Sequence, residues 1–333
     1  MTIMLTGGAG FIGSHMAAYL LQNHIDFIVV DNLSNSTLSN IEVLNKHFKT
    51  NIVFEYADIR DKEKMRNIFS RHEIDSIVHF ASLKSVSDSF VNQQLYEDNN
   101  VTGSKILFDL LKEFKIPKFI FSSSACVYGL PESLPINETH PLSAINPYGK
   151  NKIDIESLIQ KDLYFHENCS TKILRYFNPV GAFNDGIIGE IPKGVPSNLM
   201  PYLLGVVNKV YPILNVFGGD YNTPDGTAIR DYIHIMDLIH AHYLALSNNE
   251  NGVKIYNVGT GKGLSVMDII KAFEMISNKK VPYEIKPRRN GDVAVCFADS
   301  SKIKNELGWS ANHSIEKMCI DAFNFSKNID NFF

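Results

Sequence analysis

Several residue types that would place a protein in a special class are scarce in this sequence of 333 residues. The four cysteines are Cys126, Cys169, Cys296 and Cys319, and no two of them form a CxxC pair. This scatter argues against a structural zinc site and against a disulfide framework. We therefore expect a protein without a bound metal, in a reducing environment such as the cytoplasm.

Long apolar runs and an excess of basic charge are also missing. No uninterrupted run approaches the ~20 apolar residues that cross a bilayer, and the first residues lack the basic stretch of a secretory signal. The net charge of −4 and the pI near 6.3 do not favour a nucleic-acid partner. We expect neither a membrane nor a nucleic acid to be a partner of this chain.

What is present is a regular alternation of apolar and amphipathic segments. Short apolar runs predict strands at residues 3–6, 27–30, 52–56, 74–80, 118–122 and 171–176. Apolar residues at helical spacing predict helices at residues 12–22, 95–114 and 148–166. Strands separated by helices form a parallel sheet covered on both faces. The predicted fold class is therefore α/β, with a doubly wound, Rossmann-type sheet.

The composition changes near residue 178, where Gly, Pro and Asn become frequent. A chain of this length exceeds one small core and suggests one large domain or two closely joined ones. We predict a Rossmann domain at residues 1–177 and a smaller, mixed α/β domain at residues 178–333. The second domain is expected to be discontinuous, because residues 230–258 read as strand, helix and strand and should return to the first domain.

A glycine-rich turn follows the first predicted strand. Gly7, Gly10 and Gly13 stand at GxxGxxG spacing between that strand and a helix. Glycines let a backbone approach a pyrophosphate, and a helix N-terminus offers free N–H groups. Asp31 ends the second strand, where a carboxylate accepts both ribose hydroxyls of adenosine and favours NAD over NADP. The alternatives are a tight turn for the glycines and a turn cap for Asp31.

Two further strands end in candidate ligand-binding residues. Asp58 and Ile59 follow the third predicted strand. Phe80, Ala81 and Lys84 stand at or after the end of the fourth. Ligands bind at the carboxyl ends of strands in open sheets, so both positions suit a cofactor. A solvated surface charge is the alternative for Lys84.

A serine, a tyrosine and a lysine form the candidate catalytic group. Ser124 follows the fifth strand, and Tyr148 and Lys152 are four residues apart, on one helical face. A nearby ammonium favours the phenolate and lowers the tyrosine pKa from about 10. Tyr148 would then act as a base near neutral pH, while Ser124 relays the proton. The alternative is a surface Tyr–Lys pair on an amphipathic helix.

The glycine turn, Ser122–Ser124 and Tyr148-x-x-x-Lys152 resemble those of extended short-chain dehydrogenase/reductases. The closer resemblance is to UDP-glucose (UDP-galactose) 4-epimerases. It covers residues 2 to about 325 and is carried by the segments RYFNPVGA, NLMPY, DGT, RDYIH and PRRNGD at residues 175–182, 198–202, 225–227, 230–234 and 287–292. The resemblance implies an isomerase that epimerises UDP-hexoses at C4 through a transient 4-keto sugar, with tightly bound NAD recycled in each turnover. It also implies an NAD-binding first domain and a UDP-sugar-binding second domain.

The resemblance assigns roles to individual residues. Tyr148 removes the proton of the sugar 4-hydroxyl with help from Ser124, and Lys152 keeps the tyrosine acidic and binds the nicotinamide ribose. Besides the cofactor residues named above and Tyr148 with Lys152, it implies cofactor contacts for Phe11, Ile12, Asn32, Asn35, Ser36, Asn99 and Phe177. It implies substrate contacts for Lys84, Ser124, Tyr148, Asn178, Asn198, Leu199, Phe217, Arg230, Tyr232, Arg289, Asp292 and Cys296.

Structural roles are the alternative for several of these substrate residues. Arginine's fork suits a diphosphate, but Arg230 could instead pair with Asp231 or Asp225. The remaining alternatives are a solvated charge for Arg289 and turn positions for Asn178 and Asp292.

Cys296 departs from the family pattern. Members restricted to UDP-glucose and UDP-galactose carry a bulky tyrosine at this place, and members with a small residue also accept N-acetylated sugars. The resemblance therefore implies that this chain also interconverts UDP-GlcNAc and UDP-GalNAc. The alternative is a small thiol that only packs.

Two other functions occur on the same predicted fold. A nucleotide-sugar 4,6-dehydratase or decarboxylase of the same fold carries an acid pair or a glutamate just after the strand-five hydroxyl, where this chain has Ala125 and Cys126. A non-catalytic NAD-binding regulator usually loses the tyrosine or the lysine, which this chain keeps. Family members are commonly homodimers that pair through helices such as 95–114 and 148–166, so a homodimer is expected.

Overall fold

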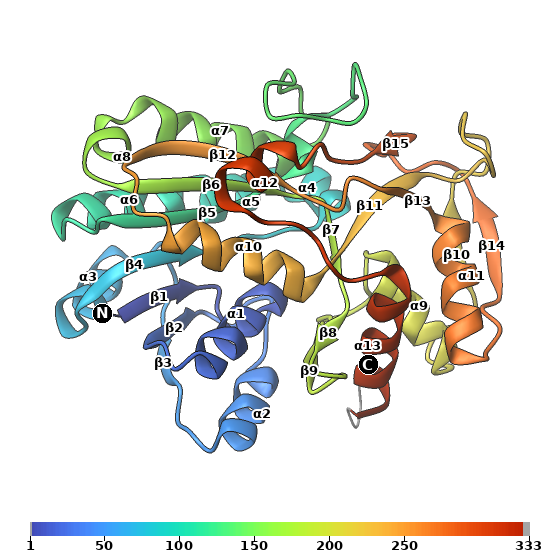
Figure 1. Ribbon diagram of the computed structural model, residues 1–333, viewed down its shortest axis with the longest axis horizontal. Coiled ribbons are helices and arrows are strands. Elements are labelled where there is room, and N and C mark those ends of the chain that lie inside the picture. The colour runs from blue at the N-terminus through green and yellow to red at the C-terminus, as the bar shows by residue number, and fades with distance from the viewer. Residues whose placement is uncertain (1, 329–333) are drawn as a thin grey trace.

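The computed structural model describes residues 2–328, and its centre is a seven-stranded parallel sheet (Figure 1). The strand order is β12-β6-β5-β4-β1-β2-β3, which reverses direction between β1 and β4. A crevice for a ligand forms at such a reversal. The strands are β1 (Thr2–Thr6), β2 (Phe27–Asp31), β3 (Val53–Tyr56), β4 (Ile74–His79), β5 (Lys118–Ser124), β6 (Ser170–Tyr176) and β12 (Gly252–Val258).

Helices cover both faces of this sheet because its strands are apolar on both sides. Leu5 and Val29 pack on one face, with α1 (Phe11–Gln22), α2 (Ser39–Phe48), α10 (Ile235–Ser247) and α12 (Ser301–Leu307). Met4 and Ile28 alternate with them and pack on the other face, with α3 (Lys62–Arg71), α6 (Gly103–Glu113), α7 (Pro147–Lys161) and α8 (Leu163–Glu167). The predicted α/β class with a doubly wound parallel sheet is confirmed.

Three predicted elements differ from the observed ones. The helix predicted at 148–166 is broken into α7 and α8, because Asp162 is extended and its side chain accepts a hydrogen bond from Tyr164 N. The helix predicted at 95–114 begins in α5 (Gln93–Tyr96), continues as a π-helical segment η1 (Glu97–Thr102) and ends in α6. Strand β5 runs two residues past its predicted end and therefore includes Ser124.

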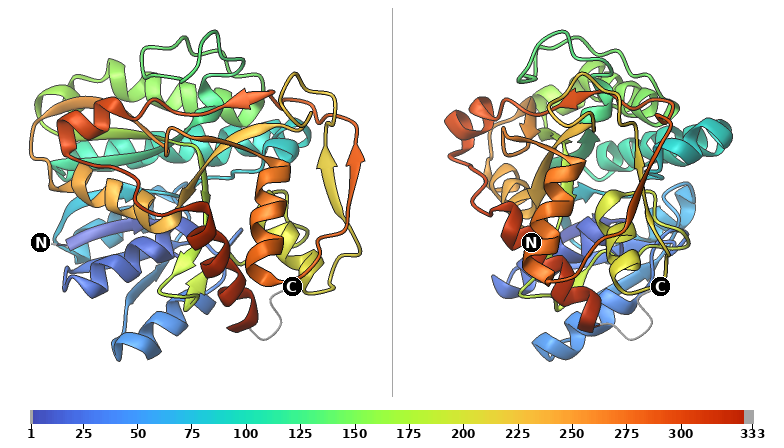
Figure 2. Two further views of the ribbon diagram at one scale, coloured as in Figure 1. Left: turned by 45° about the vertical axis from the view of Figure 1, so that its right-hand side comes forward. Right: turned by 90° about the vertical axis from the view of Figure 1, so that its right-hand side faces the viewer.

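The rest of the chain builds a smaller part beside the main sheet (Figures 1 and 2). Strand β11 (Ile229–His234) pairs with β7 (Asn178–Val180), β13 (Gly263–Ser265) and β15 (Val295–Cys296). Two further pairs are β10 (Leu214–Phe217) with β14 (Tyr283–Lys286), and β8 (Ala182–Phe183) with β9 (Ile188–Gly189). A third apolar cluster joins α9 (Leu199–Val207), α11 (Val266–Ser277) and α13 (Ile315–Asn328).

The chain returns to the main sheet after β11. Helix α10 packs in the same cluster as α1, and β12 pairs in parallel with the whole of β6. The domain boundaries at residues 177 and 178 stay a prediction, and the last predicted residue, 333, lies outside the described part of the chain. Within residues 2–328, no helix is long and apolar enough to cross a membrane.

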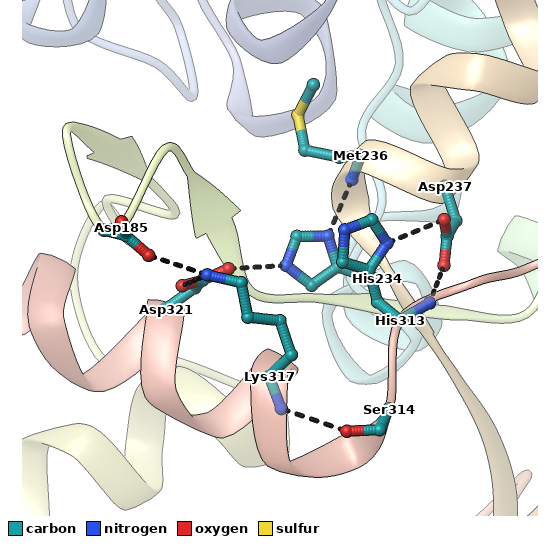
Figure 3. A network of polar contacts seen from close by, with 8 residues as sticks. All are labelled: Asp185, His234, Met236, Asp237, His313, Ser314, Lys317 and Asp321. Carbon is teal, nitrogen blue, oxygen red and sulfur yellow. Dashed lines mark hydrogen bonds and ion pairs between the residues drawn. The ribbon is translucent and has the colours of Figure 1, made fainter.

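A polar network joins the start of α10 to α13 (Figure 3). The rings of His234 and His313 stack, with centroids 4.3 Å apart and an angle of 21° between their planes. His234 Nδ1 accepts from Met236 N at 3.1 Å, so its Nε2 carries the proton and donates to Asp321 Oδ2 at 3.0 Å. His313 Nδ1 donates to Asp237 Oδ1 at 2.7 Å. The network thus fixes α13 against the helix that covers the main sheet.

Candidate active site

The glycine turn has almost no room for side chains. Gly7 has a φ of +67°, and a Cβ added to it would lie 2.6 Å from Ala81 N. A Cβ on Gly13 would lie 2.5 Å from Gly7 O. Gly10 caps α1 without a side-chain hydrogen bond, and the first turn holds no acidic residue. The turn is therefore packed closely against the loop that follows β4, and the N–H groups of α1 suit an anion such as a pyrophosphate.

Asp31 lies beside this turn, at the end of β2. Its Oδ2 accepts from Ala9 N at 3.0 Å. Its Oδ1 accepts from Leu33 N and from Ser36 Oγ, each at 2.8 Å. These bonds hold a buried carboxylate next to the glycine turn, as the adenosine ribose of NAD requires. Ser36 is connected to the predicted cofactor site by its hydrogen bond to Asp31.

Asp58 and Asn32 are brought together, but Asp58 is committed to protein partners. Asn32 Nδ2 donates to Asp58 Oδ2 at 2.8 Å, and Arg60 binds both carboxylate oxygens through Nε and Nη2. The Arg60 hydrogen bonds lower the pKa of Asp58 to about 2. Ile59 is buried and Asn35 is exposed. The contact of Asp58 and Ile59 with a cofactor stays a prediction.

The loop after β4 is held by an asparagine that the sequence reasoning missed. Asn100 Oδ1 accepts from Leu83 N at 2.8 Å, and Asn100 Nδ2 donates to Leu83 O at 3.1 Å. Asn99, which was predicted to touch the cofactor, donates to Asn100 Oδ1 at 2.9 Å. The π-helical segment supplies both asparagines, so it fixes the loop that carries Ala81 and Lys84. Two adjacent asparagines inside a predicted amphipathic helix were the feature of the sequence that could have indicated this contact.

Tyr148 lies near the start of α7, and Ser124 is the last residue of β5. Asn146 Oδ1 accepts from Gly149 N at 2.8 Å and begins the helix. A Cβ on Gly149 would lie 2.6 Å from Cys126 O. The glycine therefore lets α7 approach the end of β5, and Ser124 lies near enough to the Tyr148 hydroxyl to lower its pKa.

The electrostatics of this group correct one expectation. Burial raises the pKa of Tyr148 above its usual value, and only the Ser124 hydrogen bond lowers it. Lys152 Nζ lies 5.7 Å from the Tyr148 ring centre and donates to Ser122 O at 2.8 Å. Burial lowers the pKa of Lys152 to about 7, against the opposing effect of Glu156. Within the protein, burial therefore dominates the pKa of Tyr148, and the effect of Ser124 does not offset it.

A buried ion pair joins α7 to the main sheet. Arg175 Nη2 lies 2.6 Å from Glu156 Oε2, and Arg175 Nε donates to Glu156 Oε1 at 3.0 Å. Ser123 Oγ also donates to Glu156 Oε1, and Arg175 Nη1 donates to the Tyr128 hydroxyl at 2.9 Å. Since Glu156 is one turn beyond Lys152, these bonds tie the catalytic helix to β5 and β6.

Two arginines and an aspartate gather on the opposite side of the site. Arg289 Nε donates to Asp292 Oδ2 at 2.9 Å, and Arg230 Nη2 lies 3.7 Å from Asp292 Oδ1. Arg230 Nη1 donates to Val293 O at 2.7 Å. The Arg289 guanidinium carbon lies 4.7 Å from the centre of the Phe217 ring. The structure thus brings together four residues that were predicted to contact the substrate.

The alternative partners of Arg230 are occupied by other groups. Asp231 accepts from Thr260 N at 2.8 Å and from Thr260 Oγ1 at 2.6 Å. Asp225 accepts from Thr227 N at 2.9 Å. Arg230 therefore does not depend on Asp231 or Asp225, and its Nη1 donates instead to Ile229 O at 2.9 Å and to Val293 O.

Strand pairing determines the neighbours of the other predicted substrate residues. Cys296 lies opposite Arg230 in the register of β15 and β11, and Asn178 lies opposite Tyr232 in that of β7 and β11. Phe177 is buried, and Cys296 is partly exposed and packs on the cluster that contains it. Burial raises the pKa of Tyr232 to about 12 and that of Cys296 to about 12, so both remain protonated at neutral pH.

Lys84 and Asn198 meet on a glutamate that the sequence reasoning missed. Lys84 Nζ lies 2.9 Å from Glu190 Oε1, and Asn198 Nδ2 donates to the same oxygen at 3.3 Å. Asn198 precedes α9, and Leu199 is the first residue of that helix. Lys84 comes from the main-sheet part, so this contact crosses the space between the two parts.

Comparison with known proteins places the chain in a family. The sequence model of the GDP-mannose 4,6 dehydratase family matches residues 4–322. The UDP-glucose 4-epimerase of Bacillus subtilis (strain 168) is 45% identical, over 100% of this chain and 99% of that protein. The crystal structure of UDP-glucose 4-epimerase from Bifidobacterium longum in complex with NAD+ and UDP is 41% identical, covers 100% of both chains and has a TM-score of 0.97. The UDP-Glc/GlcNAc 4-epimerase from Campylobacter jejuni is 36% identical, over 98% of this chain and 99% of that chain, with a TM-score of 0.84. The chain therefore belongs to the UDP-glucose 4-epimerases, within the GDP-mannose 4,6 dehydratase family.

Proposed function

We propose that this chain is an NAD-dependent isomerase that interconverts UDP-glucose and UDP-galactose through a transient 4-keto sugar. The observation that carries the proposal is that the end of β5 and the first turns of α7 bring Ser124, Tyr148 and Lys152 together. The chain's 45% identity with a UDP-glucose 4-epimerase supports the same reaction.

The main-sheet part fits NAD. The glycine turn and the N-terminus of α1 would hold the pyrophosphate, and Asp31 would accept the ribose hydroxyls. Lys152 would bind the nicotinamide ribose. When bound, NAD supplies the acceptor and donor of the hydride at C4. A related structure contains NAD+ together with UDP, which supports this cofactor.

The protein's own contribution at C4 is proton transfer. A hydroxyl that becomes a ketone must lose its proton. Tyr148 would take this proton and later return it, and Ser124 lies near the same phenol, where it lowers the pKa of Tyr148. Burial opposes the phenolate form. Positive charge must therefore offset burial, and the protonated Lys152 and the charged nicotinamide are its two sources. We infer that Tyr148 becomes a base only in the enzyme that holds its oxidised cofactor.

The smaller part suits a nucleoside diphosphate. Arg230 and Arg289 offer forked donors to phosphate oxygens, and Asp292 would face the uridine ribose. A dehydratase would need an acid beside Ser124 to eliminate water. Cys126 stands there instead, and burial raises the pKa of its thiol. Epimerisation therefore suits this site better than dehydration or decarboxylation.

The test is conversion of UDP-glucose by the purified protein, followed to equilibrium by proton NMR without added NAD+. We expect UDP-galactose to accumulate, because the cofactor is regenerated in every turnover. A silent sample that stays silent after one addition of NAD+ would point to a non-catalytic NAD-binding regulator. A stable 4-keto-6-deoxy product would point to a dehydratase.

Activity on UDP-GlcNAc and UDP-GalNAc is a second proposal, which rests on Cys296. This partly exposed residue lies opposite Arg230 and is smaller than a tyrosine, so it would leave more room for an acetamido group at C2. Similarity to the UDP-Glc/GlcNAc 4-epimerase of Campylobacter jejuni supports it. We expect the wild type to convert both sugars, and Cys296→Tyr to lose roughly 10-fold or more on UDP-GlcNAc while it keeps UDP-glucose. A wild type that leaves UDP-GlcNAc untouched contradicts the proposal.

We also propose a cytoplasmic homodimer that pairs through α6 and α7. Both helices lie on the same face of the main sheet, and the neighbouring Leu95 and Leu163 are exposed apolar residues. Sedimentation equilibrium should give twice the chain mass of 37.5 kDa. A mass equal to that of one chain at micromolar concentration would contradict the proposed homodimer.

A further inference from the structure

Glu190 is a carboxylate that contacts two of the residues predicted to bind the substrate. Its side chain is 16% exposed, and one oxygen, Oε1, receives both Lys84 Nζ and Asn198 Nδ2. Glu190 also lines a small cavity with the apolar side chains of Phe11 and Met200. A carboxylate here lies on the side of the smaller part that faces the glycine turn.

The backbone around Glu190 is anchored on both sides. Gly189 O accepts from Asn40 Nδ2 at 2.9 Å, and Asn40 is buried in α2. On the other side, Lys193 Nζ donates to Leu33 O and Ser34 O, each at 3.1 Å. All of these partners belong to the main-sheet part, close to Asp31. Glu190 is therefore a fixed carboxylate at the junction of the two parts.

Such a fixed carboxylate affects how a diphosphate is bound. Alone it would repel the phosphates, but its contact with Lys84 neutralises the charge. An ammonium has three donors and an amide two, so Lys84 and Asn198 each keep a donor for a ligand while one stays on Glu190. A long side chain that is held before the ligand arrives loses less conformational entropy on binding.

We propose that Glu190 is a positioning residue, which holds Lys84 and Asn198 in place for the nucleotide sugar. The identity of that ligand rests on the proposed function. The resemblance assigns both held residues substrate contacts away from C4, so the effect of Glu190 is expected on binding rather than on the chemical step.

The test compares Glu190→Ala and Glu190→Gln with the wild type in two assays: calorimetric binding of UDP, and initial rates with UDP-glucose. We expect Glu190→Ala to weaken UDP binding and raise KM by about 10-fold, with kcat within about twofold of the wild type. Glu190→Gln should be intermediate, because its amide oxygen still accepts from Asn198 and Lys84.

Glu55→Ala is the matched control. Glu55 lies on the edge strand β3, is 18% exposed and pairs with Arg71 and His72. Glu55→Ala therefore loses a comparable ion pair at a position away from the substrate side. We expect wild-type UDP affinity for it.

Unchanged or tighter UDP binding by Glu190→Ala would overturn the proposal; tighter binding would show that Glu190 only repels the diphosphate. A lower kcat and melting temperature with unchanged KM would show a structural role and overturn it as well. If the wild type binds UDP but does not epimerise UDP-glucose, the proposed function fails while the binding assay still decides the role of Glu190.

Discussion

Burial opposes the ionisation of Tyr148, and the proposed chemistry nevertheless needs its oxygen. Tyr148→Phe removes only the hydroxyl and leaves the ring in place. We expect epimerisation of UDP-glucose to fall by about 10²- to 10⁴-fold, the range of general base catalysis. NMR rates and the NAD content of the purified variant are the measurements. Tyr283→Phe, on the exposed strand β14, is the control and should keep full activity; a Tyr148→Phe enzyme of comparable activity would exclude the assigned base.

The pKa of Lys152, lowered to about 7 by burial, makes a prediction about stability. A lysine whose pKa is lower in the folded than in the unfolded protein reduces the free energy of unfolding at any pH at which the folded protein must hold it protonated. The penalty is full below pH 7 and disappears as the pH rises from about 7 to about 10.4, the ordinary lysine pKa. The melting temperature of the wild type should therefore rise relative to that of Lys152→Met between pH 7 and pH 9.5. Parallel curves for the two proteins would contradict the buried titration.

The spacing of Tyr148 and Lys152 was readable from the sequence because both residues lie on one helix. Glu190 and Asn100 were not. Glu190 meets Lys84 across 106 positions of sequence, and no local pattern reports such a contact. The effect of burial on the pKa of Tyr148 was not readable from the sequence either. An i,i+4 lysine suggests acidification, but the burial that reverses it depends on the packing of β5 against α7.

At the scale of elements, α7 depends on the buried pair of Glu156 and Arg175. Arg175→Met removes the cation and leaves Glu156 buried without its partner. We expect the free energy of unfolding to fall by about 3–5 kcal/mol, as for other broken buried pairs, and urea denaturation measures it. The double variant Glu156→Met/Arg175→Met should recover part of the loss, since no buried charge remains. A double variant no more stable than the single one would show that packing, not charge, is lost.

The element boundaries show where local sequence stops being sufficient. The start of α7 was predictable, because Asn146 and Pro147 are a cap and a first-turn residue. The break at Asp162 and the π-helical segment η1 were not, since apolar residues continue at helical spacing through both. The π-helical turn places Asn99 and Asn100 against the loop after β4, and that contact is tertiary.

At the scale of the whole molecule, the parallel sheet places the glycine turn after β1 and the end of β5 on the same side, at the carboxyl ends of its strands. The start of α7 packs there against the end of β5. The alternation of strands and helices predicted this sheet, but not the order in which its strands pair. The last helix, α13, lies far along the chain from α10 and is joined to it by the network of Figure 3. Lys317 extends that network, with Nζ 2.7 Å from both Asp321 Oδ1 and Asp185 Oδ1.

The two histidines of this network should respond to pH with opposite signs. Burial lowers the pKa of His234, so its contribution to stability is lost as the pH falls below about 6.5. The hydrogen bond to Asp237 raises the pKa of His313, so its contribution is present below about 6.5 and is lost as the pH rises through the raised value. His313→Gln should therefore lower the melting temperature more at pH 5.5 than at pH 8.5. His234→Gln should instead reduce the acid sensitivity that the wild type shows between pH 6.5 and pH 5. If both variants shift the melting temperature equally at every pH, the rings only pack, and the attachment of α13 to α10 depends on the carboxylates and Lys317 alone.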